Sequence, residues 1–370
     1  MINTQSIEIF YKFAIENGFI VVQDNYDCYI LSNYLASVKK KFEDSLLNII
    51  QEAGYLEIAT PLFVHEDLYF SQKKDTARYK DYNTPALLYK GGFRLKKAFV
   101  APKSIEMFTK ILFEKEVHSY RELPYKVFSR TLLFNSYSFS EIFIKSLEYS
   151  TLELVCYTEV EHIKNEIDSL SNLLKDFFSI FKIQLENKVC SQESIYFTKV
   201  DDKEIVLCRY EWSVNENVEN SLLYTKKNGT TNCPLCLRCE ISEALFWYFL
   251  ISNFDGLGVI LPVSFVPYDV VLIPISINHD EQLSNYIVEI EEWLKANNIR
   301  FITDDSKKDS VGEKHFKWEK AGIPLRIEIG ERERHGRRIT IINRYTKERI
   351  ENCKFSVILD YINDVLNYWR

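Results

Sequence analysis

Hydrophobic and polar residues follow two different patterns along this chain, and the pattern changes near residues 262–267. After that point, short β-branched runs such as PYDVVLIPIS (267–276) predict strands. Between such runs, apolar side chains recur at every third or fourth position, as in residues 283–294, which predicts amphipathic helices. Strands that alternate with helices indicate an α/β domain with a mixed sheet. We therefore expect such a domain at residues 263–370.

The first 262 residues carry a different mixture of patterns. Strand-like runs, SIYFTKV (194–200), EIVLCRY (204–210) and LGVILPV (257–263), are not separated by regular crossover helices. Such a succession favours an α+β domain, an antiparallel sheet with flanking helices, over residues 1–262. One of these helices is predicted by an apolar series at helical spacing: Ile163, Ile167, Leu170, Leu174, Phe177 and Phe181.

Composition indicates folded domains. Of the 370 residues, 46% are hydrophobic and 14% are aromatic, enough for a core in each of two domains. The sequence begins without a basic stretch that leads into a long apolar run, and its longest apolar run (244–251) is too short to cross a bilayer. We therefore expect a cytoplasmic protein, in which the eight cysteines stay reduced or bind metal.

Two common kinds of active site are not supported by the sequence. Neither G-x-G-x-x-G nor G-x-x-x-x-G-K-[ST] occurs, which argues against Rossmann and P-loop nucleotide sites. His65, His118 and His162 are scattered, without a serine or cysteine partner at a recognisable spacing, so a nucleophilic triad has no support.

Four segments, in order along the chain, resemble a known family. They are GYLEIATPLF (54–63), HSYRELPYKVF (118–128), DGLGVILPVSFVPYDVVLIPI (255–275) and KHFKWEKAGIPLRIEIGERE (314–333). They resemble motif 1, the approach to motif 2, the interdomain junction and the anticodon-binding signature of class II aminoacyl-tRNA synthetases. The similarity is greatest to prolyl-tRNA synthetase of the archaeal and eukaryotic type. The resemblance implies a homodimer with Pro61 at its interface.

The residues that hold ATP in that family have changed here. Activating an amino acid with ATP builds negative charge on the phosphates, which arginine side chains and a metal ion must stabilise. Asn135 and Tyr137 stand where motif 2 of the family has arginine and glutamate, and the motif 3 arginine falls on Glu243 or Ala244. A carboxylate that faces a triphosphate would repel it. The comparison of motifs thus implies that motifs 2 and 3 are degenerate.

The amino-acid pocket differs as well. APKSI (101–105), which includes Lys103, replaces an Arg-Pro-Thr-Ser-Glu segment of the family. CRYEW (208–212), which includes Arg209 and Glu211, replaces a Thr-Ser-His segment. We therefore expect an altered former active site that does not form prolyl-tRNA with ATP. No cofactor is expected; ATP and Mg²⁺ would be needed only by an active ligase.

Residues 312–350 are basic, although the chain as a whole is acidic. This stretch has 11 Lys and Arg against 6 Glu, a charge of +5, whereas the chain carries −7 and the remainder therefore −12. Such a segment suits contacts with RNA phosphates, although most charge runs are simply solvated surfaces. The expected tRNA-binding residues are Glu319, Arg326, Lys347, Lys317, Lys320, Arg332, Arg334, Arg337 and Arg338.

The resemblance assigns base reading to Glu319 and Arg326, with Lys347 as a third position. A carboxylate beside guanidinium and ammonium groups can hydrogen-bond to unpaired bases. Arg326 has an equally good structural explanation as the ion-pair partner of Glu328 or Glu319. The sequence leaves both alternatives open.

A cysteine cluster raises the question of a metal. NCPLCLRCE places Cys233, Cys236 and Cys239 three residues apart. Together with Cys208, which the fold of the resembling family brings close, these thiolates form a candidate zinc site. The spacing is not that of a zinc ribbon, and the alternative is reduced cysteines in a half-buried strand. Zinc therefore stays an alternative to a metal-free protein.

Three functions are compatible with these observations. The first is an inactive relative of prolyl-tRNA synthetase, a pseudoenzyme, that binds tRNA or a tRNA-like RNA as an accessory factor. The second is a ligase or aminoacyl transferase of altered specificity that uses Lys103, Arg209 or zinc to stabilise charge. The third is a dimeric protein-interaction module without RNA. The loss of cationic groups for ATP and the basic segment 312–350 together favour the first.

Overall fold

The computed structural model describes residues 2–23, 28–65, 86–91, 94–100, 104–134, 148–180, 183–214, 222–275 and 281–368. Contacts divide the chain into two compact units, each assembled from several segments. Unit 1 comprises residues 1–7, 23–29 and 45–249, and unit 2 comprises residues 8–22, 30–44 and 250–370. The expected second domain, 263–370, falls within unit 2, and its boundary at residue 262 stays a prediction.

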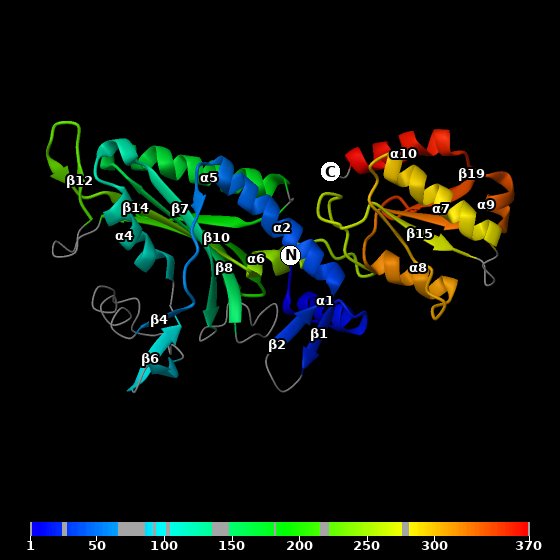
Figure 1. Ribbon diagram of the computed structural model, residues 1–370, viewed down its shortest axis with the longest axis horizontal. Coiled ribbons are helices and arrows are strands. Elements are labelled where there is room, and N and C mark those ends of the chain that lie inside the picture. The colour runs from blue at the N-terminus through cyan, green and yellow to red at the C-terminus, as the bar shows by residue number, and fades with distance from the viewer. Residues whose placement is uncertain are drawn as a thin grey trace. The chain divides into compact units, whose positions relative to one another are not determined.

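A seven-stranded sheet forms the centre of unit 1 (Figure 1). Neighbouring strands are antiparallel, except that β3 runs parallel to β7, which confirms the expected antiparallel sheet. The strand order is β3 (Leu56–Glu57), β7 (Tyr125–Phe134), β8 (Glu148–Thr158), β14 (Leu235–Ser242), β11 (Lys203–Val214), β10 (Glu193–Val200) and β9 (Glu186–Val189).

Helix α5 (Ile163–Ile180) lies along one face of this sheet (Figure 1). Three members of the predicted apolar series, Leu170, Leu174 and Phe177, are buried, which confirms the helix. Phe181 lies outside the described residues. The remaining elements of unit 1 are β4 (Phe63–His65), β5 (Ala86–Gly91), β6 (Arg94–Val100), α4 (Ser104–Glu116), β12 (Tyr224–Thr225), β13 (Thr231–Asn232) and the 3₁₀ turns Tyr120–Glu122 and Val160–His162. Helix α6 (Ala244–Ser252) follows β14.

A five-stranded mixed sheet forms the centre of unit 2, as the sequence predicts. Strand β15 pairs in parallel with β16 and β17, and the remaining pairs are antiparallel. The strand order is β16 (Phe301–Thr303), β15 (Val270–Pro274), β17 (Leu325–Ile329), β18 (Ile339–Asn343) and β19 (Arg349–Cys353). Helices α1 (Thr4–Glu16) and α2 (Asn33–Glu52), with strands β1 (Ile20–Gln23) and β2 (Cys28–Leu31), contribute residues to both units.

Both faces of this sheet are covered by helices (Figure 1). Val270 and Leu272 of β15 pack with α7 (Glu281–Ala296) and α10 (Phe355–Tyr368) on one side. The intervening Val271 and Ile273 pack with α8 (Val311–Lys320) on the other side. Successive side chains of a strand point to opposite faces, so a strand buried on both sides must be apolar throughout.

One prediction about local structure is wrong, and one element was not predicted. LGVILPV (257–263) is not a strand, because its backbone bonds to two different segments: Val259 N to Lys320 O at 3.3 Å and Ile260 N to Asn253 O at 2.8 Å. Pro262 moreover has no N–H to donate. Helix α9 (Glu331–Gly336) was not expected, since its six residues carry no apolar pattern. No helix among the described residues is long and apolar enough to span a membrane.

Candidate nucleic-acid interface

Helix α8 carries the predicted base-reading residue Glu319, and both of its ends are fixed. At its start, Ser310 N donates to Glu313 Oε2 at 2.7 Å and Glu313 N donates to Ser310 Oγ at 3.3 Å, a capping box. At its end, Gly322 has φ +72°, and a Cβ there would lie 1.8 Å from Val259 O. Only glycine permits this approach, which holds the end of α8 against the segment around Val259.

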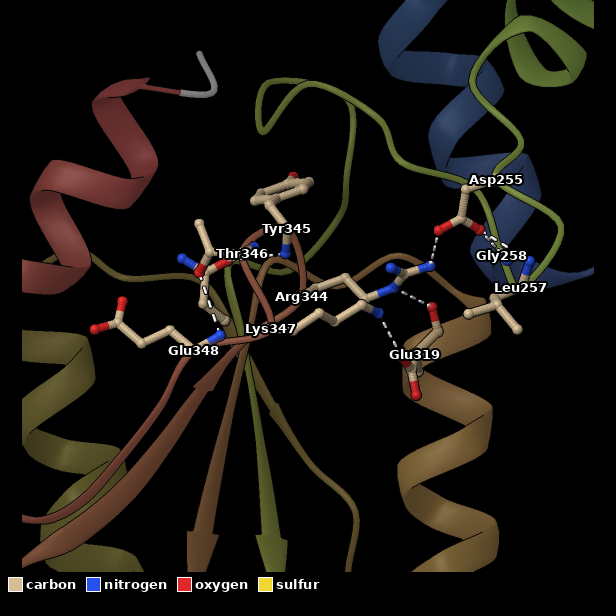
Figure 2. A network of polar contacts seen from close by, with 10 residues as sticks. Asp255, Leu257, Gly258, Glu319, Arg344, Tyr345, Thr346, Lys347 and Glu348 are labelled. Atoms are coloured by element: carbon tan, nitrogen blue, oxygen red, sulfur yellow. Dashed lines mark hydrogen bonds and ion pairs between the residues drawn. The ribbon is translucent and has the colours of Figure 1, made fainter.

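The buried Arg344 joins three segments at this end of the helix (Figure 2). It is 5% exposed, its Nε donates to Glu319 O at 2.9 Å, and its guanidinium pairs with Asp255 Oδ2 at 2.9 Å. Asp255 in turn accepts from Leu257 N and Gly258 N, at 2.9 and 2.8 Å. Arg344 is therefore a structural residue, and it fixes the backbone of Glu319.

The turn that follows Arg344 presents Lys347 to the same helix end (Figure 2). Asn343 Oδ1 accepts from Tyr345 N and Thr346 N, and Lys347 takes the left-handed conformation, with φ 61°. Lys347 Nζ then lies 2.6 Å from Glu319 Oε1. Its side chain is 51% exposed, so the ion pair is accessible to a ligand.

The pKa of Glu319 reflects this environment. Burial alone would raise it, but the hydrogen bond from Lys347, with Arg344 and Arg326 nearby, outweighs burial and holds the pKa below its ordinary value. The Glu319 carboxylate therefore stays ionised at neutral pH and can accept hydrogen bonds.

Arg326 belongs to a second cluster, centred on the buried Glu328. Glu328 is 2% exposed, and it accepts from Arg326 Nε at 3.0 Å and pairs with Arg349 at 2.9 Å. His315 Nε2 of α8 lies 3.1 Å from the same carboxylate. Of the two partners proposed for Arg326, the structure selects Glu328. Burial, together with Arg326, lowers the pKa of His315 below its ordinary 6.5.

The basic segment does not form one continuous patch. Lys314 is buried and donates to Asp304 O at 3.0 Å, and Arg344 is buried as described above. Lys317 pairs with Asp304 at 3.0 Å and Lys320 donates to Asn17 Oδ1 at 2.6 Å, both from α8. The other four expected residues, Arg332, Arg334, Arg337 and Arg338, lie in or next to α9, beyond the opposite end of β17 from Glu319.

The residues around α9 also have partners within unit 2. Arg334 pairs with Glu331 at 2.7 Å, Arg337 pairs with Glu289, and Arg338 donates to Asn352 O at 3.3 Å. A strand of five residues separates this group from Glu319 by about 16 Å. The expected single basic patch is thus corrected to two groups, of which the one at α8 includes two of the three base-reading positions, Glu319 and Lys347.

The expected former active site falls on the sheet of unit 1, on the face opposite α5. Arg209 and Glu211 of β11 point to this face, where Arg209 pairs with Glu193 at 3.1 Å and Glu211 with Arg238 at 3.6 Å. Glu240 and Glu153 share the face through strand register. Strand register also places Lys188, Lys199, Glu186 and Glu204 on this face, so four basic residues against six glutamates give −2 among its described residues. Such a face repels polyphosphate.

Glu243 lies at the start of α6 and is bound by its neighbours. Its carboxylate accepts from Ser150 N at 2.7 Å and from Tyr29 Oη at 2.8 Å. These contacts give a structural role to Glu243, one of the two positions, with Ala244, at which the motif 3 arginine was expected. Asn135, Tyr137 and Lys103 lie outside the described residues.

Pro61 is exposed and follows the edge strand β3. Leu56, Leu62 and Phe63 around it are exposed apolar side chains, at 68%, 40% and 41%. An edge strand with exposed apolar neighbours can accept another chain.

The cysteines do not converge on a metal site. Cys236 and Cys239 lie three residues apart in β14, so they point to opposite faces of the sheet. Cys239 lies 3.8 Å from Cys208, sulfur to sulfur, whereas Cys236 packs among apolar residues near α4. Within the described ranges, no three His, Cys, Asp or Glu side chains are grouped to hold a metal ion. The four-cysteine zinc site is therefore corrected: strand alternation separates its members.

Sequence reasoning missed several residues of these sites. Arg238 and Glu193 pair with the expected sheet residues only because three strands align, which no local signal reveals. Asp255 and Arg344 are separated by 89 positions. Phe316 lies one turn before Glu319 in α8, so a helix assigned to this segment would have placed the two side by side.

Comparisons with known proteins agree with this geometry. Residues 269–364 match the anticodon binding domain family. The chain is 24% identical over 343 residues to a proline–tRNA ligase of Saccharolobus islandicus, covering 86% of this chain and 70% of that protein. For the ligase of Sulfurisphaera tokodaii the identity is 25% over 335 residues, covering 85% and 68%.

A solved structure has the same fold. The prolyl-tRNA synthetase of Giardia lamblia, in complex with prolyl-adenylate, matches with a TM-score of 0.81 at 20% identity, covering 99% of this chain and 81% of that one. The chain is thus similar to the prolyl-tRNA synthetases: it has the fold of the Giardia lamblia enzyme, and its residues 269–364 match the anticodon binding domain family.

Proposed function

We propose that this protein binds tRNA, or a tRNA-like RNA, as a non-catalytic accessory factor, and that it has lost ATP-dependent activation of proline. The RNA would contact unit 2 at the end of α8, where Glu319 and Lys347 are accessible. The sheet face of unit 1 would serve as scaffold. The proposed domains are 1–262, the degenerate catalytic domain, and 263–370, the anticodon-binding domain.

The observation that carries the proposal is the preformed ion pair of Glu319 and Lys347, 2.6 Å apart. Arg344 fixes its position by donating a hydrogen bond to the backbone carbonyl of Glu319. An unpaired guanine presents N–H donors and a carbonyl acceptor side by side. The N–H groups can donate to the Glu319 carboxylate, and the carbonyl oxygen can accept from the Lys347 ammonium. A base with that edge would bind without leaving either charge unpaired.

Loss of catalysis is supported by the sheet face. Both of its described arginines, Arg209 and Arg238, already pair with glutamates. ATP activation needs preorganised positive charge aimed at the phosphates. A face with a surplus of carboxylates opposes that charge distribution.

A homodimer through the region around Pro61 is part of the proposal. The edge strand β3 and the exposed Leu56, Leu62 and Phe63 support it. Sedimentation of the wild type and of a Leu62→Asp, Phe63→Asp variant measures it: the wild type is expected to sediment as a dimer and the variant as a monomer.

Two assays on the intact chain test the function. Filter binding of unfractionated tRNA between 50 and 200 mM salt is expected to show affinity that falls steeply with salt, roughly as phosphate contacts require. Proline-dependent exchange of pyrophosphate into ATP is expected to stay at background. Robust exchange would overturn the loss of catalysis, and no tRNA affinity at low salt would overturn the RNA-binding role.

A pair of matched variants locates the RNA site. Lys347→Met is expected to weaken tRNA binding about tenfold, because a base contact is lost. Lys12→Met removes a lysine with a similar exposed ion pair to Glu16, 3.8 Å apart on α1, and is expected to change binding little. Equal effects of both substitutions would place the RNA elsewhere.

A further inference from the structure

An exposed aromatic ring stands beside the proposed base-reading pair. Phe316 of α8 is 61% exposed, whereas Trp318 and Lys314 of the same helix are buried. A single exposed apolar side chain is ordinary on a protein surface. The surroundings of Phe316 give it a more specific meaning.

Phe316, Glu319 and Lys320 lie on one face of α8, because residues three and four apart in a helix are neighbours. The Lys320 ammonium lies over the Phe316 ring, 5.5 Å from its centroid. Lys320 is itself held by Asn17 Oδ1 at 2.6 Å. The Phe316 ring therefore has a fixed cation close to it and is otherwise largely exposed to solvent.

We propose that Phe316 is a stacking platform for an unpaired base of the bound RNA, next to the pair that reads a base edge; this rests on the proposed function. Aromatic side chains bind splayed-out bases through their faces, and nearby cations strengthen the contact. Lys320, next to Glu319 in sequence, and Lys347, its ion-pair partner, supply positive charge for the adjoining phosphates. The combination of ring, carboxylate and cations matches a nucleotide better than an apolar peptide segment.

The probe is a synthetic anticodon stem-loop RNA of a proline tRNA, bound to the intact chain. Phe316→Ala is expected to weaken binding about tenfold, since one stacked base is lost. The salt dependence is expected to stay the same, because no charge is removed. Phe316→Trp is expected to retain the affinity, and its added tryptophan fluorescence is expected to be quenched by the RNA.

Val288→Ala is the matched control, since Val288 is an exposed apolar residue on α7 of the same unit, at 49%. Its affinity is expected to equal that of the wild type. Thermal unfolding of each variant checks the fold, and both side chains are exposed enough that the melting temperature should change little.

The outcomes separate this inference from the proposed function. If Phe316→Ala binds like the wild type, or if RNA leaves the fluorescence of Phe316→Trp unchanged, Phe316 is no stacking platform, and the RNA-binding role stands. A protein partner at Phe316 would give that same result. If the wild type does not bind the stem-loop at low salt, both proposals fail.

Discussion

Arginine serves opposite purposes in the two units. On the sheet face of unit 1, Arg209 and Arg238 reach a partly exposed surface, and each ends on a glutamate of a neighbouring strand. In unit 2, Arg344 is buried and contacts a backbone carbonyl and one aspartate. It leaves Lys347 exposed beside Glu319.

The difference shows that a count of basic residues does not locate an anion site. The sheet face contains arginines yet is net acidic, whereas the end of α8 owes its accessible charges to an arginine that no ligand can reach. What matters is whether a cation has spare hydrogen-bonding capacity toward solvent, and tertiary contacts decide that.

The most severe way to break the site of unit 2 is to displace the end of α8. Gly322→Ala is expected to destabilise the protein by about 4 kcal/mol, because the left-handed backbone and a Cβ 1.8 Å from Val259 O both oppose the substitution. Urea unfolding measures this. Gly312→Ala, in the same helix with nothing within 4 Å of the added Cβ, is the control and is expected to be neutral or slightly stabilising. Equal effects would contradict the close approach at Gly322.

Removing the buried brace is the next largest perturbation. Arg344→Met is expected to cost about 3 kcal/mol in the free energy of unfolding, since Asp255 loses its cation and Glu319 O loses its donor. Affinity for tRNA should fall as well, because Glu319 and Lys347 lose their support. Arg337→Met removes an exposed ion pair with Glu289 and is expected to change stability by less than about 1 kcal/mol. A mild effect of Arg344→Met would mean that the turn holds Lys347 without it.

On the sheet face of unit 1, we expect a substitution to raise the affinity for MgATP. Glu193→Gln removes the carboxylate that pairs with Arg209, so the affinity for MgATP is expected to rise about fivefold in calorimetric titration. Glu161→Gln, at the ion pair with Lys226 outside this sheet, is the control and is expected to leave the affinity unchanged. Tight binding of MgATP by the wild type would contradict the role assigned to the paired glutamates.

The smallest expected effect concerns pH. Because burial and Arg326 lower the pKa of His315, the folded state prefers the neutral imidazole and the unfolded state binds more protons below pH 6.5. Stability should therefore fall as the pH drops from 6.5 toward 5, and His315→Gln should remove part of that fall. A wild type and a His315→Gln variant with parallel pH profiles would refute this assignment.

Local pattern was sufficient for much of the fold. Helix α7 buries Leu283, Ile287, Ile290 and Leu294 as their spacing predicts, and β15 is apolar on both faces as a central strand must be. The prediction of a strand at LGVILPV (257–263) failed because an apolar run indicates burial. It does not show which groups the backbone hydrogen-bonds to. In this case the hydrogen bonds go to Asn253 and Lys320.

The candidate sites were harder to predict because they depend on the direction in which each side chain points. Three cysteines three apart suggest a cluster, yet a strand points Cys236 and Cys239 to opposite faces. Eleven basic residues in 39 positions suggest a patch, yet β17 divides them and the core takes in Lys314 and Arg344.

The sequence by itself determined the two kinds of sheet, most of the helices and the likeness to prolyl-tRNA synthetases, because periodicity and motif order are local or collinear properties. Only the tertiary structure decided which charges are accessible. Whether an arginine faces a glutamate, a carbonyl or water depends on strand register and on helix ends that meet across the chain. Those long-range contacts distinguish the net acidic sheet face, whose arginines are paired, from the accessible Glu319–Lys347 pair.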